Sequence, residues 1–382
     1  MILAAGYGTR LWPLTIDRAK PAIPFLGRPL VGYVAEYLAS HGCREVAVNL
    51  HHRPESVRDS LGDGSRFGVR LTYVEEPDIL GTSGALDNAR DFFTEDTEDT
   101  FVVVNGKIAT DIDLGRAIET HRRTHALATL VLRPNPAREK YSTVEIRGDR
   151  LAGFGGHPTP ASDKPGDANS VSQKTVSTES ATHAGGTESA GNAESVASSG
   201  QGIEAAPFIA REPRARSGYR DDVPLMFTGI HILDRRVFDF IPRGVFSDSV
   251  TDVYPTAHAA GERIGAHVAE GNYWYELSTI PRYLDTSLAL LRNEGGTLDL
   301  GPGSKIETGS DVSDAVLWEN VRVEAGARVR RAVLGAGVRV GAGETIEDAA
   351  VVRAALVRAE ERPAKALAGE FRGDNFVVPL PR

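Results

Sequence analysis

The residues best suited to chemistry in this sequence lie in its first segment, MILAAGYGTRLWPLTIDRAKPAIP (1–24). A short apolar run ends at a turn that contains Gly6 and Gly8. Because glycine has no side chain and tolerates positive φ, successive backbone amides can converge on anionic oxygens there. Arg10 adds a permanently charged planar group that matches phosphate, and Lys20 adds a compact second cation. This combination predicts a phosphate-binding loop after a buried strand.

The spacing of the glycines excludes the two commonest phosphate loops. No third glycine completes a dinucleotide fingerprint, and no Gly-Lys-Ser/Thr ends a Walker loop. The segment instead resembles the N-terminal signature of sugar-1-phosphate nucleotidylyltransferases, approximately LxxGxGxRLxPLT followed by KPxxP. The residues that fit this signature are Leu3, Gly6, Gly8, Arg10, Leu11, Pro13, Leu14, Thr15, Lys20, Pro21 and Pro24.

Bulk composition limits the classes of function. The 382 residues suffice for one large domain or two ordinary ones. Acidic residues outnumber basic residues by 52 to 43, so the net charge of −9 argues against general binding to nucleic acid or to a membrane surface. One cysteine, Cys43, cannot form an internal disulfide, and no apolar run resembles a signal peptide or a membrane span. We therefore expect a cytoplasmic protein, whose natural start lies a few residues upstream because the first strand begins at Met1 itself.

Strand and helix patterns alternate after the loop. Helices are predicted at 30–41, 54–61, 84–93, 114–124, 250–260 and 280–293, and strands at 1–5, 45–50, 69–74, 101–104, 127–132, 143–154 and 224–233. Strands that are apolar throughout are typical of a mostly parallel α/β sheet covered on both faces. Ligands bind outside the carboxyl ends of such strands, so the glycine loop, 76–82 and Asn105-Gly106 should converge.

Two regions depart from this alternation. In 157–218 Ser, Thr, Gly, Ala and Glu dominate, which predicts a disordered insertion into the first domain, with a regulatory or partner-binding tail as the alternative. After Gly295, apolar residues recur at steps often near six: Ile306, Val312, Val321, Ala327, Val333, Val338 and Ile346. This recurrence resembles the hexapeptide repeat of a left-handed parallel β-helix, with unrelated hairpins as the alternative.

We accordingly divide the chain into a Rossmann-like nucleotidyltransferase domain (1–294) and a short left-handed β-helix with a C-terminal tail (295–382). Trp318 is expected to pack the β-helix against the first domain or against a second subunit. So few turns of a β-helix need a cap or a partner surface, which favours homo-oligomerisation through that part of the chain.

The resemblance covers nearly the whole chain outside the insertion and is strongest to bacterial mannose-1-phosphate guanylyltransferase-like proteins. It implies transfer of a nucleotidyl group from a nucleoside triphosphate to a sugar 1-phosphate, with release of pyrophosphate. GTP and mannose 1-phosphate are the first choice, while glucose or N-acetylmuramate with UTP or dTTP stays open. Arg10 would bind the leaving β,γ-phosphates and Lys20 the attacking phosphate or the α-phosphate.

Five further segments resemble family motifs in the expected order. They are VEEPDILGTSG (74–84), which faces the nucleobase, Asn105-Gly106, Glu145, Thr228-Gly229-Ile230 and YWYELSTIP (273–281). The resemblance implies nucleotide binding by Leu3, Ala4, Ala5, Gly6, Gly8, Thr9, Arg10, Glu76, Gly81 and Thr82, and sugar binding by Asn105, Gly106, Glu145 and Gly229. Glu76 could accept hydrogen bonds from guanine, or could be a solvated loop carboxylate.

The expected Mg²⁺ site departs from the family pattern. Lys107 stands where the family has a metal-binding aspartate, and Glu276 stands at the second aspartate. Glutamate keeps an oxygen ligand, whereas a charged lysine repels the ion. The lysine of the family's EKP element is also missing, because Gly155-Gly156-His157-Pro158 occupies that region.

Three hypotheses follow from this departure. The protein is an enzyme with a rearranged metal site, in which Asp111 or Asp113 joins Glu276 or Lys107 itself supplies the charge. Alternatively, it is a nucleotide-binding regulatory paralogue without catalysis. A hexapeptide acyltransferase is disfavoured, because the β-helix region holds no histidine that could act as a base.

Overall fold

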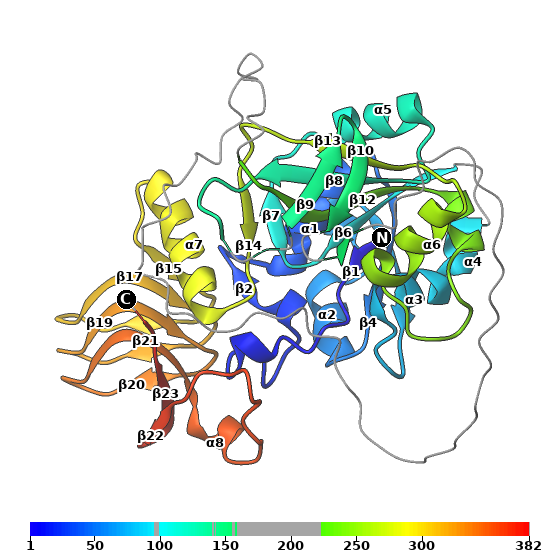
Figure 1. The fold of residues 1–382 in the computed structure, drawn as a ribbon. Helices are drawn as coiled ribbons and strands as arrows, with labels where there is room; N and C mark the ends of the chain where they lie inside the picture. The colour runs from blue at the N-terminus through cyan, green and yellow to red at the C-terminus, as the bar shows by residue number, and fades with distance from the viewer. Residues whose placement is uncertain (95–98, 140, 142, 155–156, 159–222, 382) are drawn as a thin grey trace, which may run out of the picture.

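The computed structural model describes residues 1–94, 99–139, 141, 143–154, 157–158 and 223–381. A large sheet with helices forms the N-terminal part, and a coil of short strands forms the C-terminal part (Figure 1). The predicted insertion at 157–218 lies outside the described residues except for His157–Pro158, which form strand β11. None of the described helices combines the length and the apolar character that crossing a membrane requires.

Most predicted helices are confirmed. The helices are α1 (Leu30–Ser40), α2 (Pro54–Leu61), α3 (Gly81–Asn88), α4 (Arg90–Thr94), α5 (Leu114–Thr124), α6 (Tyr254–Ala259), α7 (Ile280–Asn293) and α8 (Ala354–Val357). The helix predicted at 84–93 is two helices, and the one predicted at 250–260 begins with a π turn at Ser249–Val253.

The large sheet contains ten strands. They are β1 (Ile2–Leu3), β4 (Glu45–Leu50), β5 (Arg70–Glu75), β6 (Thr100–Asn105), β8 (Ala128–Pro134), β9 (Thr143–Arg147), β10 (Arg150–Phe154), β11, β12 (Leu225–Asp234) and β13 (Ile264–Val268). Their order is β11-β10-β13-β8-β12-β6-β1-β4-β5, and β9 pairs with β10 and β12. The strand predicted at 143–154 is therefore a hairpin of two strands.

The prediction of a mostly parallel sheet fails at β12 and at the hairpin of β9 and β10, so the sheet is mixed. Strands β6, β1, β4 and β5 run parallel, as do β8 and β13, but β12 is antiparallel to its partners β6, β8 and β9. Strand β12 is buried along almost its whole length. A central antiparallel strand covered on both faces has the same continuous apolar run as a parallel one, so the sequence pattern does not reveal its direction.

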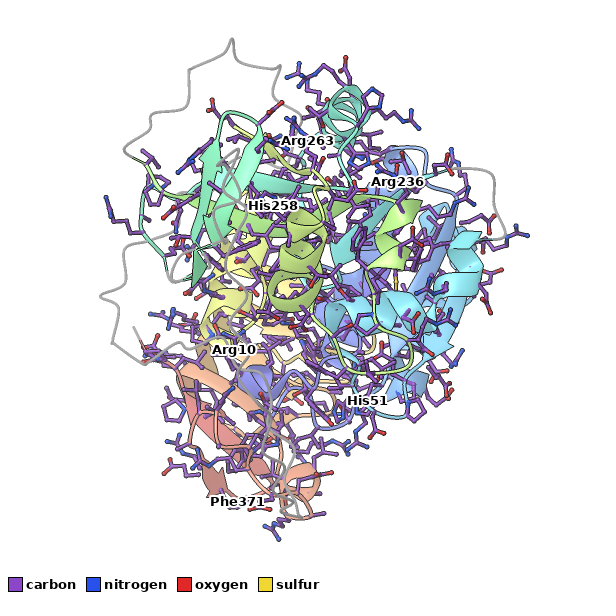
Figure 2. All side chains as sticks on the ribbon, turned by 45° about the vertical axis from the view of Figure 1, so that its right-hand side comes forward. Arg10, His51, Arg236, His258, Arg263 and Phe371 are labelled. Atoms are coloured by element: carbon purple, nitrogen blue, oxygen red, sulfur yellow. The ribbon has the colours of Figure 1, made fainter. Side chains whose placement is uncertain are left out.

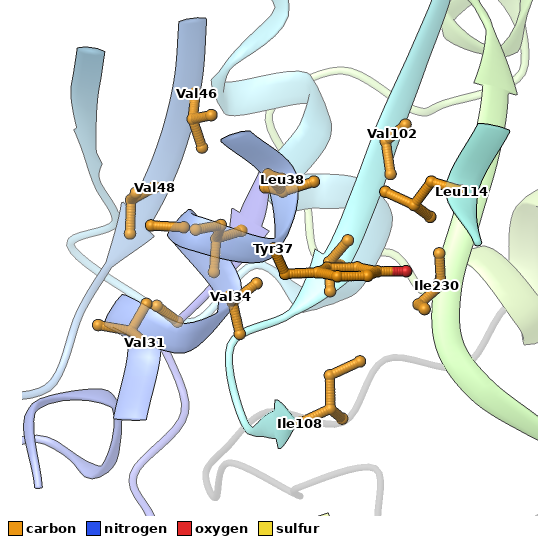
Figure 3. Packing of buried hydrophobic residues seen from close by; sticks show 14 of the residues in the cluster. Val31, Val34, Tyr37, Leu38, Val46, Val48, Val102, Ile108, Leu114 and Ile230 are labelled. Atoms are coloured by element: carbon orange, nitrogen blue, oxygen red, sulfur yellow. The ribbon is translucent and has the colours of Figure 1, made fainter. Parts of the chain in front are cut away.

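The two faces of the sheet pack in two separate clusters. Val46 and Val48 of β4 face α1, α2 and α5, whereas Ala47 between them faces α3, α4 and α6. Figure 3 shows the first cluster, where the ring of Tyr37 extends from α1 toward Leu114 and Ile230. Because neighbouring strand residues point to opposite faces, this alternation confirms that helices cover both sides.

The C-terminal part is a coil of parallel strands. One sheet contains β15 (Leu298–Leu300), β17 (Asp311–Leu317), β19 (Arg328–Leu334) and β21 (Thr345–Arg353), and another contains β16 (Lys305–Ile306), β18 (Arg322–Val323) and β20 (Arg339–Val340). Each strand pairs with the strand 17 residues later, as in Asp311 with Arg328 and Arg328 with Thr345. The antiparallel strands β22 (Glu370–Arg372) and β23 (Asn375–Pro379) extend the first sheet.

A third cluster joins the N-terminal loop to this coil. It contains Leu11 and Leu14 of the loop, Tyr283 of α7, and Trp318 and Phe376 of the coil. The indole Nε1 of Trp318 donates to the Tyr283 hydroxyl (3.0 Å), which donates to the Pro24 carbonyl. Trp318 thus packs the coil against the first domain, as one of the two predicted alternatives has it.

Candidate active site

The glycine loop follows β1 and leads into a 3₁₀ turn, Thr9–Leu11. Gly8 has φ +66°, and a Cβ there would lie 2.9 Å from the Cβ of Lys20. A side chain at this position is therefore excluded both by the backbone conformation and by the lysine. Gly6 has open space around it. The loop and Lys20 thus lie side by side, as the phosphate-binding interpretation requires.

A buried chain of hydrogen bonds holds the start of this loop. The Ala4 amide donates to Asn49 Oδ1 (2.7 Å), and Asn49 Nδ2 donates to Glu76 Oε1 (2.6 Å). The Leu80 amide donates to the second oxygen of Glu76 (3.1 Å). Glu76 is 3% exposed, and burial raises its pKa. The alternative of a solvated loop carboxylate is wrong, and the base-reading role of Glu76 stays a prediction.

The segment Gly81–Thr82 lies at the start of α3 and is braced by the loop at 245–249. Gly81 has φ +75°, and a Cβ there would lie 2.5 Å from the Ser247 carbonyl oxygen. The Thr82 hydroxyl donates to Asp248 Oδ2 (3.1 Å). The sequence does not predict this brace, which fixes the two candidate nucleotide-binding residues against a distant part of the chain.

The candidate sugar-binding residues Asn105, Gly106 and Gly229 lie together. Gly229 has φ +82°, and a Cβ there would collide with the Asn105 amide group. Asn105 is the register partner of Leu3, and the Gly106 amide donates to the Leu3 carbonyl (2.9 Å). The glycine loop is therefore adjacent to the sugar corner, the name we give to Asn105, Gly106 and Gly229. Glu145 is exposed on β9.

A short two-stranded sheet places Lys107 against Glu276. Strand β7 (Ile108–Thr110) is antiparallel to β14 (Trp274–Glu276), with Ile108 opposite Glu276. The Lys107 ammonium forms an ion pair with Glu276 Oε1, and the Ser278 hydroxyl donates to Glu276 Oε2 (3.1 Å). Although burial raises the pKa of Glu276, the Lys107 charge and hydrogen bond hold it below its ordinary value.

Three basic side chains act on one another near this pair. Burial, together with the charges of Lys107 and Arg10, holds the pKa of Lys20 well below its ordinary value, while Glu276 opposes the shift. Lys107 and Glu276 are 35% and 10% exposed, respectively. The basic side chains near the loop therefore outnumber the one carboxylate, that of Glu276. Such an excess of positive charge is what a site for phosphate groups requires.

Arg10 is exposed on the 3₁₀ turn of the glycine loop. Within the described ranges, no carboxylate forms an ion pair with it. Figure 2 shows Arg10 and His51 between the large sheet and the end of the molecule that carries Phe371. Two cavities, of about 210 and 420 Å³, lie against the coil and are lined by none of the candidate site residues.

The side chains around Lys107 do not fit a divalent ion. Asp111, the predicted additional ligand, accepts a hydrogen bond from the Tyr273 amide (2.8 Å), and burial raises its pKa. No group of three His, Cys, Asp or Glu side chains suited to a metal exists among the residues that the structure describes. Glu276, in turn, already faces the Lys107 ammonium. The role of Asp111 and Glu276 as metal ligands stays an untested prediction.

Comparison with known proteins identifies the architecture. The family model described as "Nucleotidyl transferase" matches residues 1–293, and a model of the GlmU-like C-terminal hexapeptide matches residues 298–358. This chain belongs to the nucleotidyl transferase family. The match to the hexapeptide model agrees with the repeat expected after Gly295.

The chain is similar to two known transferases and to one solved structure. A UTP–glucose-1-phosphate uridylyltransferase of Synechocystis sp. is 27% identical over 84% of this chain and 71% of that protein. A mannose-1-phosphate guanylyltransferase of Mycobacterium tuberculosis is 25% identical over 84% of this chain and 80% of that protein. A structure of a putative glucose-1-phosphate thymidylyltransferase from Bacillus anthracis matches with a TM-score of 0.51 at 19% identity, covering 75% of this chain and 93% of that chain. This last likeness concerns the fold alone.

Some residues that position the candidate site are not predicted from the sequence. Asn49 links the glycine loop to Glu76, and Ser278 holds Glu276. His51 contacts the Tyr7 hydroxyl through Nε2 (3.1 Å) and the Glu76 carbonyl through Nδ1 (2.8 Å). The position of Asn49 at the carboxyl end of a predicted strand is a usable signal, since that is where α/β sheets place ligand-binding residues. Ser278 has no such signal.

Proposed function

We propose that this protein transfers a nucleotidyl group from a nucleoside triphosphate to a sugar 1-phosphate and releases pyrophosphate. The observation that carries the proposal is the position of Arg10, exposed and without an ion-pair partner among the described residues, on a glycine loop that also packs against Lys20. The Asn105–Gly229 corner adjoins that loop through Leu3. A triphosphate and a sugar phosphate can therefore bind next to each other.

The reaction needs positioning and charge neutralisation more than a nucleophilic side chain. An oxygen of the sugar phosphate attacks the α-phosphorus in line, and pyrophosphate leaves from the opposite side. In this arrangement Arg10 binds the leaving β,γ-phosphates and Lys20 binds the α-phosphate or the attacking phosphate. Substrate anions near Lys20 oppose the lowering of its pKa, so substrate binding favours the charged form of this lysine.

GTP and mannose 1-phosphate are the substrates that we propose first. The M. tuberculosis relative is named a mannose-1-phosphate guanylyltransferase. UTP with glucose 1-phosphate is the nearest competitor, since the Synechocystis relative is named for that pair. The choice depends on a few hydrogen bonds to the base and sugar, which small changes of side chain alter.

We further propose that the C-terminal coil is a left-handed parallel β-helix through which the cytoplasmic protein forms homo-oligomers. The match to the hexapeptide model and the 17-residue register of its parallel strands support the β-helix. Phe371 at its far end is 51% exposed, so it is the residue that we test for a contact with a second copy. Sedimentation of the unmodified protein and of Phe371→Ser tests whether the protein is an oligomer. The proposal fails if both proteins sediment as monomers.

The reaction is tested by pyrophosphate release from GTP, UTP, dTTP, CTP and ATP, each offered with mannose, glucose and N-acetylmuramate 1-phosphates. We expect release with one triphosphate and one sugar phosphate, and its loss in Arg10→Ala. If the folded protein releases no pyrophosphate with any pair of triphosphate and sugar phosphate, the proposal is contradicted.

A non-catalytic regulatory paralogue is the second candidate. The Lys107–Glu276 ion pair favours it, because this pair fills the corner where the family pattern has two aspartates. Such a paralogue binds a nucleotide or nucleotide sugar in a calorimetric titration without turning it over. Co-purification with an active relative then distinguishes it from an inactive preparation.

A further inference from the structure

The backbone, and not only the side chains, fixes the ion pair between Lys107 and Glu276. Lys107 lies in the turn that joins β6 to β7, and its carbonyl accepts a hydrogen bond from the Leu277 amide (3.0 Å). Glu276 lies opposite Ile108, one residue after Lys107. The ladder between β7 and β14 therefore carries both charged residues to the same corner, whichever rotamers they adopt.

Glu276 and Lys107 use this corner differently. Both carboxylate oxygens of Glu276 have protein donors, one from Lys107 and one from the Ser278 hydroxyl. Lys107 is 35% exposed, so its ammonium remains accessible while its position is held. An ammonium has three N–H donors, and the single oxygen of Glu276 that faces Lys107 does not accept from all of them. Lys107 thus presents positive charge at a fixed place.

The same ammonium acts electrostatically on Lys20 beside the glycine loop. Phosphate oxygens held by the loop and by Lys20 therefore lie within the field of Lys107. A divalent cation at this corner would meet the ammonium and find its nearest carboxylate already paired. The corner holds a covalently attached cation where a metal would neutralise phosphate charge.

We infer that the Lys107 ammonium takes the place of a divalent metal, so that this protein binds and transfers the nucleotidyl group without one. The inference rests on the proposed function. In the transfer step, a sugar phosphate oxygen forms a bond to the α-phosphorus, and the bond from that phosphorus to the bridging oxygen breaks. The electron pair leaves with pyrophosphate, and Lys107 keeps its proton. Glu276 is a positioning residue, which aims the ammonium before the substrate arrives.

The test measures triphosphate binding by calorimetry and pyrophosphate release, each in excess EDTA and in Mg²⁺. The variants are Lys107→Gln, which removes the charge, Lys107→Arg, which keeps it, and Lys107→Asp, which places a carboxylate beside Glu276. Lys305→Gln, at an exposed lysine of β16, is the matched control. Circular dichroism checks that each variant folds.

We expect the unmodified protein to bind its triphosphate equally well in both media. Loss of one charge-assisted contact in Lys107→Gln should weaken binding in EDTA about tenfold or more, with little change in Lys107→Arg or Lys305→Gln. Lys107→Asp should bind only when Mg²⁺ is present. These results, with release that EDTA leaves unchanged, support the inference.

Binding or release that requires Mg²⁺ in the unmodified protein overturns the inference and leaves the proposed function standing. Equal binding by Lys107→Gln and the unmodified protein in EDTA also overturns it. Metal-independent binding that depends on the charge of Lys107, without release for any pair of substrates, supports the role of the lysine in binding and contradicts the proposed reaction. Failure of every triphosphate to bind in either medium overturns both.

Discussion

Arg10 and Lys107 both act on Lys20, but they are held in opposite ways. Lys107 is paired with Glu276 on a two-stranded ladder, whereas Arg10 stands exposed on a turn without an ion-pair partner in the described part of the chain. The paired cation is positioned before any substrate arrives, at the cost of part of its charge. The unpaired cation keeps its full charge for a ligand, but no carboxylate fixes its position beforehand. Lys107 thus offers a charge in a precise place, whereas Arg10 offers a stronger attraction for a ligand.

Removing Arg10 should have the largest effect on turnover. Arg10→Ala takes away the cation proposed for the leaving pyrophosphate, and we expect kcat to fall about 10²- to 10³-fold, as for other groups that stabilise developing charge. The melting temperature should not change, since Arg10 is exposed. Arg322→Ala, an exposed arginine of the coil, is the control. Equal activity of the two variants would refute the role of Arg10.

Lys20→Met should lower nucleotide binding but raise stability. Burial lowers the pKa of Lys20, so the unfolded chain holds more protons than the folded chain between the two pKa values. The stability of the unmodified protein therefore rises with pH across that window, and charged Lys20 is most costly below it. The gain from Lys20→Met should be largest at low pH and vanish only above pH ~10.4, the ordinary lysine value, where the lysine of the unfolded chain also loses its charge.

Chemical denaturation across this pH range measures that gain. Lys305→Met, at an exposed lysine, should leave the pH dependence of stability unchanged. A constant difference between Lys20→Met and the unmodified protein at every pH would show that the charge of Lys20 is not the cause.

Gly229→Ala should disturb the proposed sugar-binding residues Asn105 and Gly229 more than the glycine loop. The positive φ strains an alanine, and its Cβ meets the Asn105 amide, so we expect a loss of about 1–3 kcal/mol of stability. Displaced Asn105 should raise KM for the sugar phosphate more than for the triphosphate. Gly271→Ala, with φ +78° and open space, is the control for backbone strain alone. An equal rise of both KM values would contradict separate corners.

Glu76→Gln should have the smallest effect and decide what this buried carboxylate does. If its main role is to hold Asn49 and the Leu80 amide, every triphosphate should bind a few-fold more weakly, in line with the ~1 kcal/mol net value of a buried hydrogen bond. If Glu76 instead recognises guanine, only the binding of GTP should become weaker. Competition between GTP and UTP in one assay measures the difference directly.

The sequence predicts the parts of this fold that depend on local pattern. The periodic apolar residues and the flanking Pro29 and Gly42 give α1 to within one residue, and α7 is predicted to the residue. The direction of β12 is not predictable in this way, because it depends on which strands lie beside it and not on its own composition. Likewise, the brace of Ser247 on Gly81 joins residues far apart in the chain, and no local pattern marks it.

The candidate site shows the same division. Gly8, Arg10 and Lys20 lie close together in one contiguous motif, so their types and spacing suffice to predict a common loop. The resemblance places Lys107 and Glu276 at one site, but their ion pair depends on the register of β7 and β14, which no local pattern marks. The sequence does reveal that Lys107 is unusual, but only the pairing shows which charge it meets.

The packing of Trp12 has a further consequence for the behaviour of the whole molecule. Trp12 follows the 3₁₀ turn of the glycine loop, and its ring lies edge-on to Phe376 of the coil, with centroids 5.6 Å apart. Trp318 lies in the same cluster. A ligand that binds the loop should therefore also restrain the coil, and indole fluorescence should sense phosphate binding from outside the reacting centre. Heat should then melt both parts in a single transition, which moves upward when the loop is occupied.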